Sequence, residues 1–227
     1  MRTFLPKIDK QIVAEMPSTT FEGQILEVST PEEAAEAVNH ILTHPVVGID
    51  TETRPAFKKG LSYPVALLQV ATLTRCYLFR LHMMTNYDDI QRLFEAKQTI
   101  KVGLSIHDDI RALRGRIKNI QPQNCLDIQK MVNDYGIFEL SLQKIFAIIF
   151  QHKISKAQRL TNWEANPLTP AQQQYAATDA WATLLLYHQL IRTPKITEKQ
   201  KQHILQELAL IEEERINAQK LRKEEQL

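Results

Sequence analysis

The segment Val46–Thr53 constrains the fold of this chain more than any other. Its first half, Val46-Val47-Gly48-Ile49, is apolar and mostly β-branched, which is typical of a strand buried in a sheet. Asp50 and Glu52 follow directly. Because side chains at i and i+2 on a strand project from one face, the two carboxylates are expected roughly 6–7 Å apart. Such a pair is costly unless a cation neutralises it, and oxygen ligands suit Mg²⁺ or Mn²⁺.

The order of strands and helices indicates a mixed sheet. Three successive strands joined by short connections are expected to be antiparallel neighbours, and alternating helices and strands follow them. The predicted strands are 24–28, 46–53, 65–71, 76–81, 100–104 and 125–128. The predicted helices are 31–44, 87–96, 108–114, a short one ending at 135, 142–150 and 170–191, the first with Thr30 as N-cap and Glu33 closing a capping box. The predicted fold class is α/β, with helices on both faces of the sheet.

Length and composition favour one ordinary domain with appendages. The chain has 227 residues, of which 44% are hydrophobic and 24% charged. We expect an N-terminal extension at 1–20, which wraps the surface, a domain at 21–195 and a charged C-terminal helix at 196–227. The helix carries a short apolar stripe, Ile204, Leu208 and Ile211, and is expected to dock and then fray. Binding of a partner by this helix is the less favoured interpretation.

The net charge leaves the function open, and the cysteine content favours a reducing compartment. The formal net charge is +2, which neither demands nor excludes nucleic acid. Cys76 and Cys125 show no metal-ligand spacing, which is typical of free thiols in a reducing compartment. The N-terminus lacks the apolar core of a signal peptide, and the longest apolar run, at 145–150, is too short to span a bilayer. A soluble, cytoplasmic protein is therefore expected.

Further acids recur at positions where a site could form. Tyr175 and Asp179 are four residues apart on a predicted helix that is largely apolar, where an isolated acid would be costly. Asp108 and Asp109 follow the predicted strand at 100–104, near the sheet edge where ligands gather in α/β proteins. Each pair alone is more often a solvated turn or a surface hydrogen bond, but the set points to a metal-dependent site.

In this set the chain resembles a known family, the ribonuclease D and Werner-type 3'-5' exonucleases with a catalytic tyrosine. Their three motifs correspond to Asp50-Thr51-Glu52, to Asp109 with Leu113, and to Tyr175 through Asp179. The intervening segments at 65–72, 76–79 and 162–169 also match, so the likeness covers roughly Phe21 to Leu190. It implies a ribonuclease-H-like fold. It also selects Asp109 over Asp108, which is then expected to face outward and cap its helix.

The resemblance implies phosphodiester hydrolysis with two divalent metal ions, Mg²⁺ or Mn²⁺, acting on nucleic acid with a free 3' end. The implied metal ligands and catalytic carboxylates are Asp50, Glu52, Asp109 and Asp179. Tyr175 would orient the attacking water, because a phenol with a pKa near ~10 is a poor base at neutral pH. The residues at 162–163 and 175–179 resemble those of the Werner-type members, which slightly favours DNA as the substrate. The alternatives are an RNA-processing exoribonuclease of the ribonuclease D type and a catalytically silent nucleic-acid or protein binding module.

Basic residues gather around the second motif and are expected to lie along the substrate strand and contact its phosphates. They are Lys97, Lys101, Arg111, Arg114, Arg116 and Lys118. Arg111 and Arg114, together with Thr51 and Arg159, are the expected substrate contacts. Trp163 could stack on a base, but packing in the core is the favoured interpretation.

Overall fold

The computed structural model describes residues 4–58 and 60–224, with side chains up to residue 218. The strands are β1 (Gln24–Val28), β2 (Val46–Thr53), β3 (Val65–Ala71), β4 (Arg75–Arg80), β5 (Ile100–Gly103) and β6 (Cys125–Asp127). The α-helices are α1 (Lys10–Glu15), α2 (Pro31–Ile41), α3 (Asp88–Glu95), α4 (Ile106–Leu113), α5 (Ile128–Met131), α6 (Leu142–Phe150), α7 (Pro170–Leu190) and α8 (Glu198–Glu224). A 3₁₀ turn, η1 (Val132–Tyr135), continues α5.

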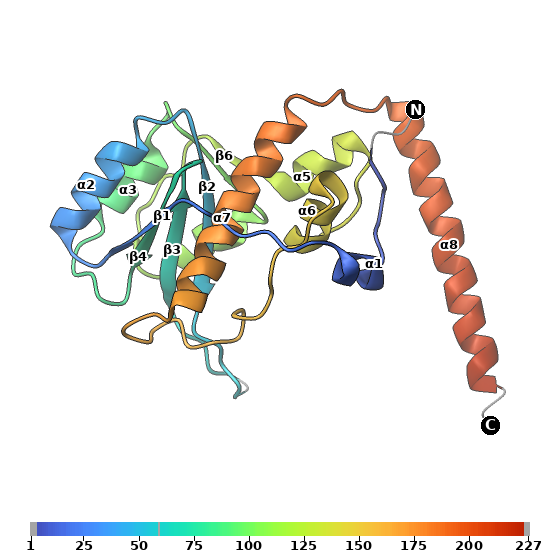
Figure 1. The fold of residues 1–227 in the computed structure, drawn as a ribbon, viewed down its shortest axis with the longest axis horizontal. Coiled ribbons are helices and arrows are strands. Elements are labelled where there is room, and N and C mark those ends of the chain that lie inside the picture. Colours follow the sequence, from blue (N-terminus) through green and yellow to red (C-terminus); the bar gives the residue numbers. More distant parts are fainter. Residues whose placement is uncertain (1–3, 59, 225–227) are drawn as a thin grey trace.

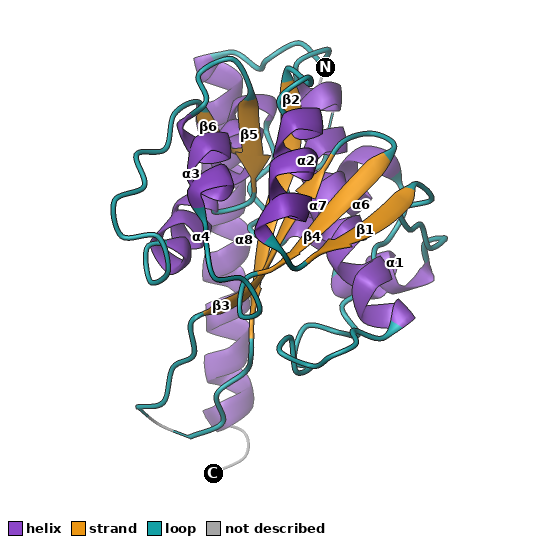
Figure 2. Ribbon diagram, turned by 90° about the vertical axis from the view of Figure 1, so that its left-hand side faces the viewer, coloured by secondary structure: helices purple, strands orange, loops and turns teal. Residues whose placement is uncertain are grey.

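The six strands form one mixed sheet in the order β1-β4-β3-β2-β5-β6. Strand β3 runs antiparallel to β2 and β4, whereas β1 is parallel to β4, and β5 is parallel to both β2 and β6. All seven residues of β3 are buried. Figure 1 shows α2 and α3 on one side of the sheet and α7 on the other, and Figure 2 shows the sheet from the side of α2 and α3. The predicted mixed α/β fold is confirmed.

Helix α7 lies unusually close to strand β2, and Gly48 permits the approach. A Cβ atom at Gly48 would lie 1.9 Å from the carbonyl oxygen of Ala180 and 2.9 Å from Oγ1 of Thr183. Any side chain there would push the helix away. The helix itself begins with a capping box between Thr169 and Gln172. The contact fixes α7 over the strand that carries Asp50 and Glu52.

Several local predictions differ from the structure. Helix α2 ends at Ile41, three residues before the expected end. Helix α4 begins at Ile106, and its N-cap is Ser105 with φ +58°, so the prediction that Asp108 caps this helix is wrong. The short helix α1 was not predicted from the sequence, because six residues contain too little periodicity to be recognised.

The N-terminal segment crosses the surface and joins the main body by backbone contacts. A β-bridge pairs Ser18 with Lys153, and the backbone N–H of Phe21 donates to Oγ1 of Thr178 on α7 at 3.1 Å. Figure 1 shows this segment running in front of α7.

Helix α8 docks only near its start. Ile204 is buried and lies over Gly136, whereas Ile211 is 60% exposed. Figure 1 shows the rest of α8 extending away from the other helices. Over the described residues, no helix is both long enough and apolar enough to cross a bilayer.

Candidate active site

Three carboxylates converge where β2 meets α7. One oxygen each of Asp50, Glu52 and Asp179 lies within 4.8 Å of the others. Asp50 and Glu52 share a face of β2, as the alternation of the strand requires, and Asp179 reaches them from α7. They line a cleft of about 380 Å³ together with Thr51, Leu104, Ser141, Leu142, Gln143, Lys156, Arg159 and Tyr175.

Asp109 joins this group through Thr51. Oγ1 of Thr51 donates a 2.6 Å hydrogen bond to Oδ1 of Asp109, which is buried on α4. Asp108 points away, with 69% of its side chain exposed, and pairs with Arg111 at 3.2 Å. The structure therefore turns Asp109 inward and Asp108 outward. Thr51, expected to contact substrate, lines the cleft and also holds this acid.

The electrostatics of the cluster are those of crowded carboxylates. Burial raises the pKa of Asp50 well above its ordinary value, and the charges of the other three acids raise it further. Burial and the charges of Asp179 and Asp109 raise the pKa of Glu52 to about 8. Burial raises the pKa of Asp109 to about 7, against the hydrogen bond from Thr51. Burial likewise raises the pKa of Asp179 to about 7. The protein alone does not neutralise these acids.

The three convergent acids, Asp50, Glu52 and Asp179, fit a divalent cation. All the donors are carboxylate oxygens, which hard cations prefer. Oδ1 of Asp179 is buried and has no hydrogen-bond partner among the described residues. An orphaned buried acceptor is costly, and a bound cation would satisfy it. The donor set therefore suits Mg²⁺ or Mn²⁺.

Tyr175 lies beside Asp179 on the cleft wall. Burial raises the pKa of its phenol above the ordinary value, and the charges of Asp179 and Glu52 raise it further. The hydroxyl is therefore neutral at physiological pH. Its ring packs against Trp163, with centroids 5.9 Å apart. Trp163 is fully buried, so its packing in the core is confirmed.

Two basic side chains, Lys156 and Arg159, line the cleft, and of these only Arg159 was predicted. Lys156 was missed, because it lies in a loop that has no sequence period. Its Nζ donates to Oγ of Ser141 at 3.3 Å. Burial raises the pKa values of Asp179 and Glu52, and the positive charges of Lys156 and Arg159, respectively, oppose that rise only in part.

The other predicted basic residues do not reach the cleft. Arg111 on α4 and Arg114, the C-cap residue of that helix, are exposed and do not line the cleft. Lys101 is buried, and its Nζ donates to the carbonyl oxygen of Ala96 at 2.6 Å. Arg116 donates to the carbonyl oxygen of Val65. Lys101 therefore stabilises the fold, which corrects the prediction that it lies along the phosphates. Arg116 is half-buried, and the same prediction for it stays a prediction.

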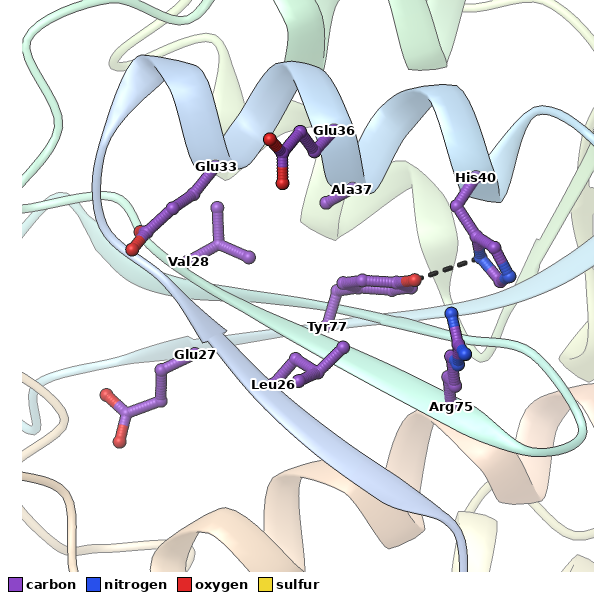
Figure 3. Close-up of a pocket in the computed structure, with 9 residues that line it drawn as sticks. All are labelled: Leu26, Glu27, Val28, Glu33, Glu36, Ala37, His40, Arg75 and Tyr77. Atoms are coloured by element: carbon purple, nitrogen blue, oxygen red, sulfur yellow. Dashed lines mark hydrogen bonds between the residues drawn. The ribbon is translucent and has the colours of Figure 1, made fainter.

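A second hollow, of about 350 Å³, lies between α2 and strands β1 and β4 (Figure 3). Several of its polar groups are engaged with the protein. The hydroxyl of Tyr77 lies 2.9 Å from Nδ1 of His40. Oε2 of Glu33 accepts from two backbone N–H groups at the start of α2, and Glu27 pairs with Arg80. Among the described residues, the carboxylates of this hollow form no group close enough to hold a metal ion.

The mixed sheet and the acidic cleft define the class of protein, a ribonuclease-H-like nuclease domain. A family model described as 3'-5' exonuclease matches residues 25–193. This chain therefore belongs to the 3'-5' exonuclease family, as the resemblance predicted.

Curated relatives agree with this membership. Exonuclease 3'-5' domain-containing protein 2 of Drosophila melanogaster is 34% identical over 161 residues, or 69% of this chain and 27% of that protein. The bifunctional 3'-5' exonuclease/ATP-dependent helicase WRN of Mus musculus is 28% identical over 198 residues, or 81% of this chain and 14% of that protein. The chain thus spans less than a third of either relative.

Solved structures show the same fold. The EXO domain of Nibbler from Aedes aegypti superposes with a TM-score of 0.70 at 19% identity, covering 82% of this chain and 94% of that one. RNase D of Escherichia coli, described as an exoribonuclease involved in structured RNA processing, gives a TM-score of 0.66 at 19% identity. That match covers 75% of this chain and 44% of RNase D. At this level of identity the likeness concerns the fold.

Proposed function

We propose that this protein is a 3'-5' exonuclease that depends on divalent metal ions and releases nucleoside 5'-monophosphates. The observation that carries the proposal is the convergence of Asp50, Glu52 and Asp179 within 4.8 Å at one end of a cleft. Asp109 stands behind them, held by Thr51. The membership of the 3'-5' exonuclease family supports the same reaction.

Each residue of the cleft has a definite task in this proposal. Asp50, Glu52, Asp109 and Asp179 would hold two divalent cations, Mg²⁺ or Mn²⁺. When bound, such ions supply an activated water and stabilise the charge on the leaving oxygen. Tyr175 would orient the water by a hydrogen bond through its phenol. Its pKa is raised, so it acts as a donor and not as a base.

Two basic side chains of the cleft would contact the substrate. Arg159 and Lys156 line the same cleft as the acids and would bind phosphate oxygens. Glu52 would also contact the terminal 3'-hydroxyl, as the family resemblance implies, which restricts attack to a free 3' end. Arg111 and Arg114 stay candidates for contacts to the strand outside the cleft.

The substrate is proposed to be single nucleic-acid strands, with DNA ranked slightly ahead of RNA. The residues of the third motif, Tyr175 through Asp179, resemble those of the Werner-type members, which favours DNA. RNA is favoured by the similarity in fold to an exoribonuclease. DNA and RNA have the same phosphodiester linkage, and only contacts to the 2'-hydroxyl of RNA distinguish them. Matched DNA and RNA oligonucleotides of one sequence, labelled at the 5' end, decide between the two.

A catalytically silent binding module is the competing function. Its acids would have no cation to bind, so Mg²⁺ or Mn²⁺ would leave its thermal stability unchanged. The test is a 5'-labelled oligonucleotide incubated with Mn²⁺, with Mg²⁺ and with EDTA. We expect a ladder of shortened products with either ion and none in EDTA. A ladder that persists in EDTA would contradict the metal-dependent mechanism, and intact substrate in all three samples would favour the silent module.

A further inference from the structure

Gln69 on strand β3 carries a polar group that the described part of the protein leaves without a partner. Its side chain is fully buried. Neither Nε2 nor Oε1 of its amide makes a hydrogen bond to any described residue. An amide buried in this way destabilises a fold, because it gives up its hydrogen bonds to water and gains none in return. A methionine would fill the same space without that penalty, so the amide itself needs a reason.

The side chain of Gln69 lies on the face of the sheet that α7 covers. In the register of β2 and β3, Gln69 is the residue opposite Asp50, and residues directly opposite each other on antiparallel strands share a face. That face is turned to α7, because Gly48, two residues before Asp50, is where β2 approaches Ala180. Ala71, two residues after Gln69, packs in one apolar cluster with Ala180. The amide is therefore enclosed between β3 and α7.

Of the two residues that flank Gln69 across the sheet, only one can bond to an amide. On β4 the opposite residue is Leu78, which offers no polar side-chain atom. On β2 it is Asp50, whose carboxylate accepts hydrogen bonds. The Cβ atoms of directly opposite residues are about 4.5–5.5 Å apart, a gap that a glutamine side chain spans by a change of rotamer. The unpartnered amide and the first acid of the cleft are therefore neighbours.

We infer that Gln69 is a positioning residue that holds Asp50 in place when the cleft binds a divalent cation. The inference rests on the proposed metal-dependent function and deepens it. Nε2 of Gln69 donates to one carboxylate oxygen of Asp50 and leaves the other oxygen to the ion. Gln69 is not among the residues that line the cleft, so it acts on the ion through Asp50. Asp109 already has a partner of this kind, the hydroxyl of Thr51.

The test compares two buried glutamines, one whose amide lacks partners and one whose amide has them. The second is Gln172 at the start of α7, which is 4% exposed. Its Nε2 donates to Oγ1 of Thr161 at 3.0 Å and to the carbonyl oxygen of Asn162 at 3.1 Å. Each glutamine is replaced by methionine, which keeps the length of the side chain and removes the amide. The dissociation constant for Mn²⁺, from the paramagnetic resonance signal of the free ion, and Tm in EDTA are measured at one pH.

The two variants should give opposite patterns. Gln69→Met should weaken Mn²⁺ binding roughly 10–100-fold, as loss of a partner of a metal-ligating carboxylate does. Its Tm in EDTA should equal or exceed that of the wild type, because an unpaired buried amide is gone. Gln172→Met should lower Tm and keep the wild-type Mn²⁺ affinity. Equal Mn²⁺ affinity of Gln69→Met and wild type overturns the inference. So does a lower Tm together with weaker binding, because a disturbed fold then explains the loss.

A double-mutant cycle tests whether Gln69 acts through Asp50. Gln69→Met is combined with Asp50→Ala and, as the control, with Glu52→Gln. Once Asp50 is replaced, loss of the amide should change the Mn²⁺ dissociation constant by less than about twofold, whereas the loss should persist in full beside Glu52→Gln. An undiminished loss in the Asp50→Ala protein overturns the inference, because Gln69 then affects the ion by another route.

These measurements need no substrate, so they separate this inference from the proposed function. Wild-type protein that binds Mn²⁺ but shortens no strand contradicts the proposed exonuclease, and the comparison of Gln69→Met with Gln172→Met still decides the role of Gln69. Wild-type protein that binds no Mn²⁺ contradicts both, because Asp50 then has no ion to face.

Discussion

Two hollows of this molecule, the acidic cleft and the hollow beside α2, have similar volumes but different chemistry. The cleft between β2 and α7 measures about 380 Å³ and the hollow beside α2 about 350 Å³. In the second hollow several polar groups have partners in the protein, such as Tyr77 with His40. In the cleft the carboxylates face each other, and Oδ1 of Asp179 has no partner among the described residues. Unsatisfied charge, not volume, distinguishes a site prepared for a ligand.

The largest expected difference between the hollows is in catalysis. Asp50→Asn should lower kcat by about 10³-fold or more, because electrostatic stabilisation by a bound ion is worth several kcal/mol. Glu36→Gln beside the second hollow removes a carboxylate of similar type and should leave kcat unchanged. Rates of product release from a 5'-labelled strand measure both. Equal rates for the two variants would remove the distinction between the hollows.

Asp108 and Asp109 make the same comparison within one turn of helix. Asp109→Asn should be nearly inactive, because this acid is buried and held by Thr51. Asp108→Asn should keep most of the wild-type rate, because its side chain is exposed and pairs only with Arg111. Both are measured at one Mg²⁺ concentration. The reverse order of activities would make Asp108 the ligand.

Much of this arrangement could be predicted from the sequence. The period of two in β2 placed Asp50 and Glu52 on one face, and the spacing of four placed Tyr175 and Asp179 on one face of α7. Lys156 was missed because it lies in a loop, where no period relates it to the acids. The cap of α4 was mispredicted because Ser105 adopts a left-handed conformation that its residue type rarely takes.

The metal-free protein should lose stability as pH rises, and the cleft is the cause. The folded pKa values of Glu52, Asp109 and Asp179, about 8, 7 and 7, exceed the unfolded values near ~4. The folded state therefore binds more protons, so its stability is greatest below pH ~4 with respect to these groups and falls as pH rises toward 8. We expect Tm in EDTA to be several degrees lower at pH 8 than at pH 6.

Substitution and metal test the origin of this slope. Asp50→Asn should raise Tm in EDTA at pH 8, because it removes one of the repelling charges, and Mn²⁺ should raise Tm of the wild type by neutralising them. Glu36→Gln should keep the wild-type slope between pH 6 and pH 8. If Asp50→Asn leaves Tm and its pH dependence unchanged, repulsion in the cleft does not limit the stability of the fold.

The smallest effects come from one substitution made in both hollows. Tyr175→Phe removes the hydroxyl that orients water, so kcat should fall about 10²-fold while KM stays nearly constant. The ring keeps its packing on Trp163, so Tm should barely move. Tyr77→Phe removes the 2.9 Å contact with His40 and should lower the free energy of unfolding by about 1 kcal/mol without changing kcat. Steady-state kinetics and thermal unfolding of the two variants should thus give opposite patterns. Wild-type turnover in Tyr175→Phe would make Tyr175 a structural residue like Tyr77, because loss of a hydroxyl would then matter to neither hollow's chemistry.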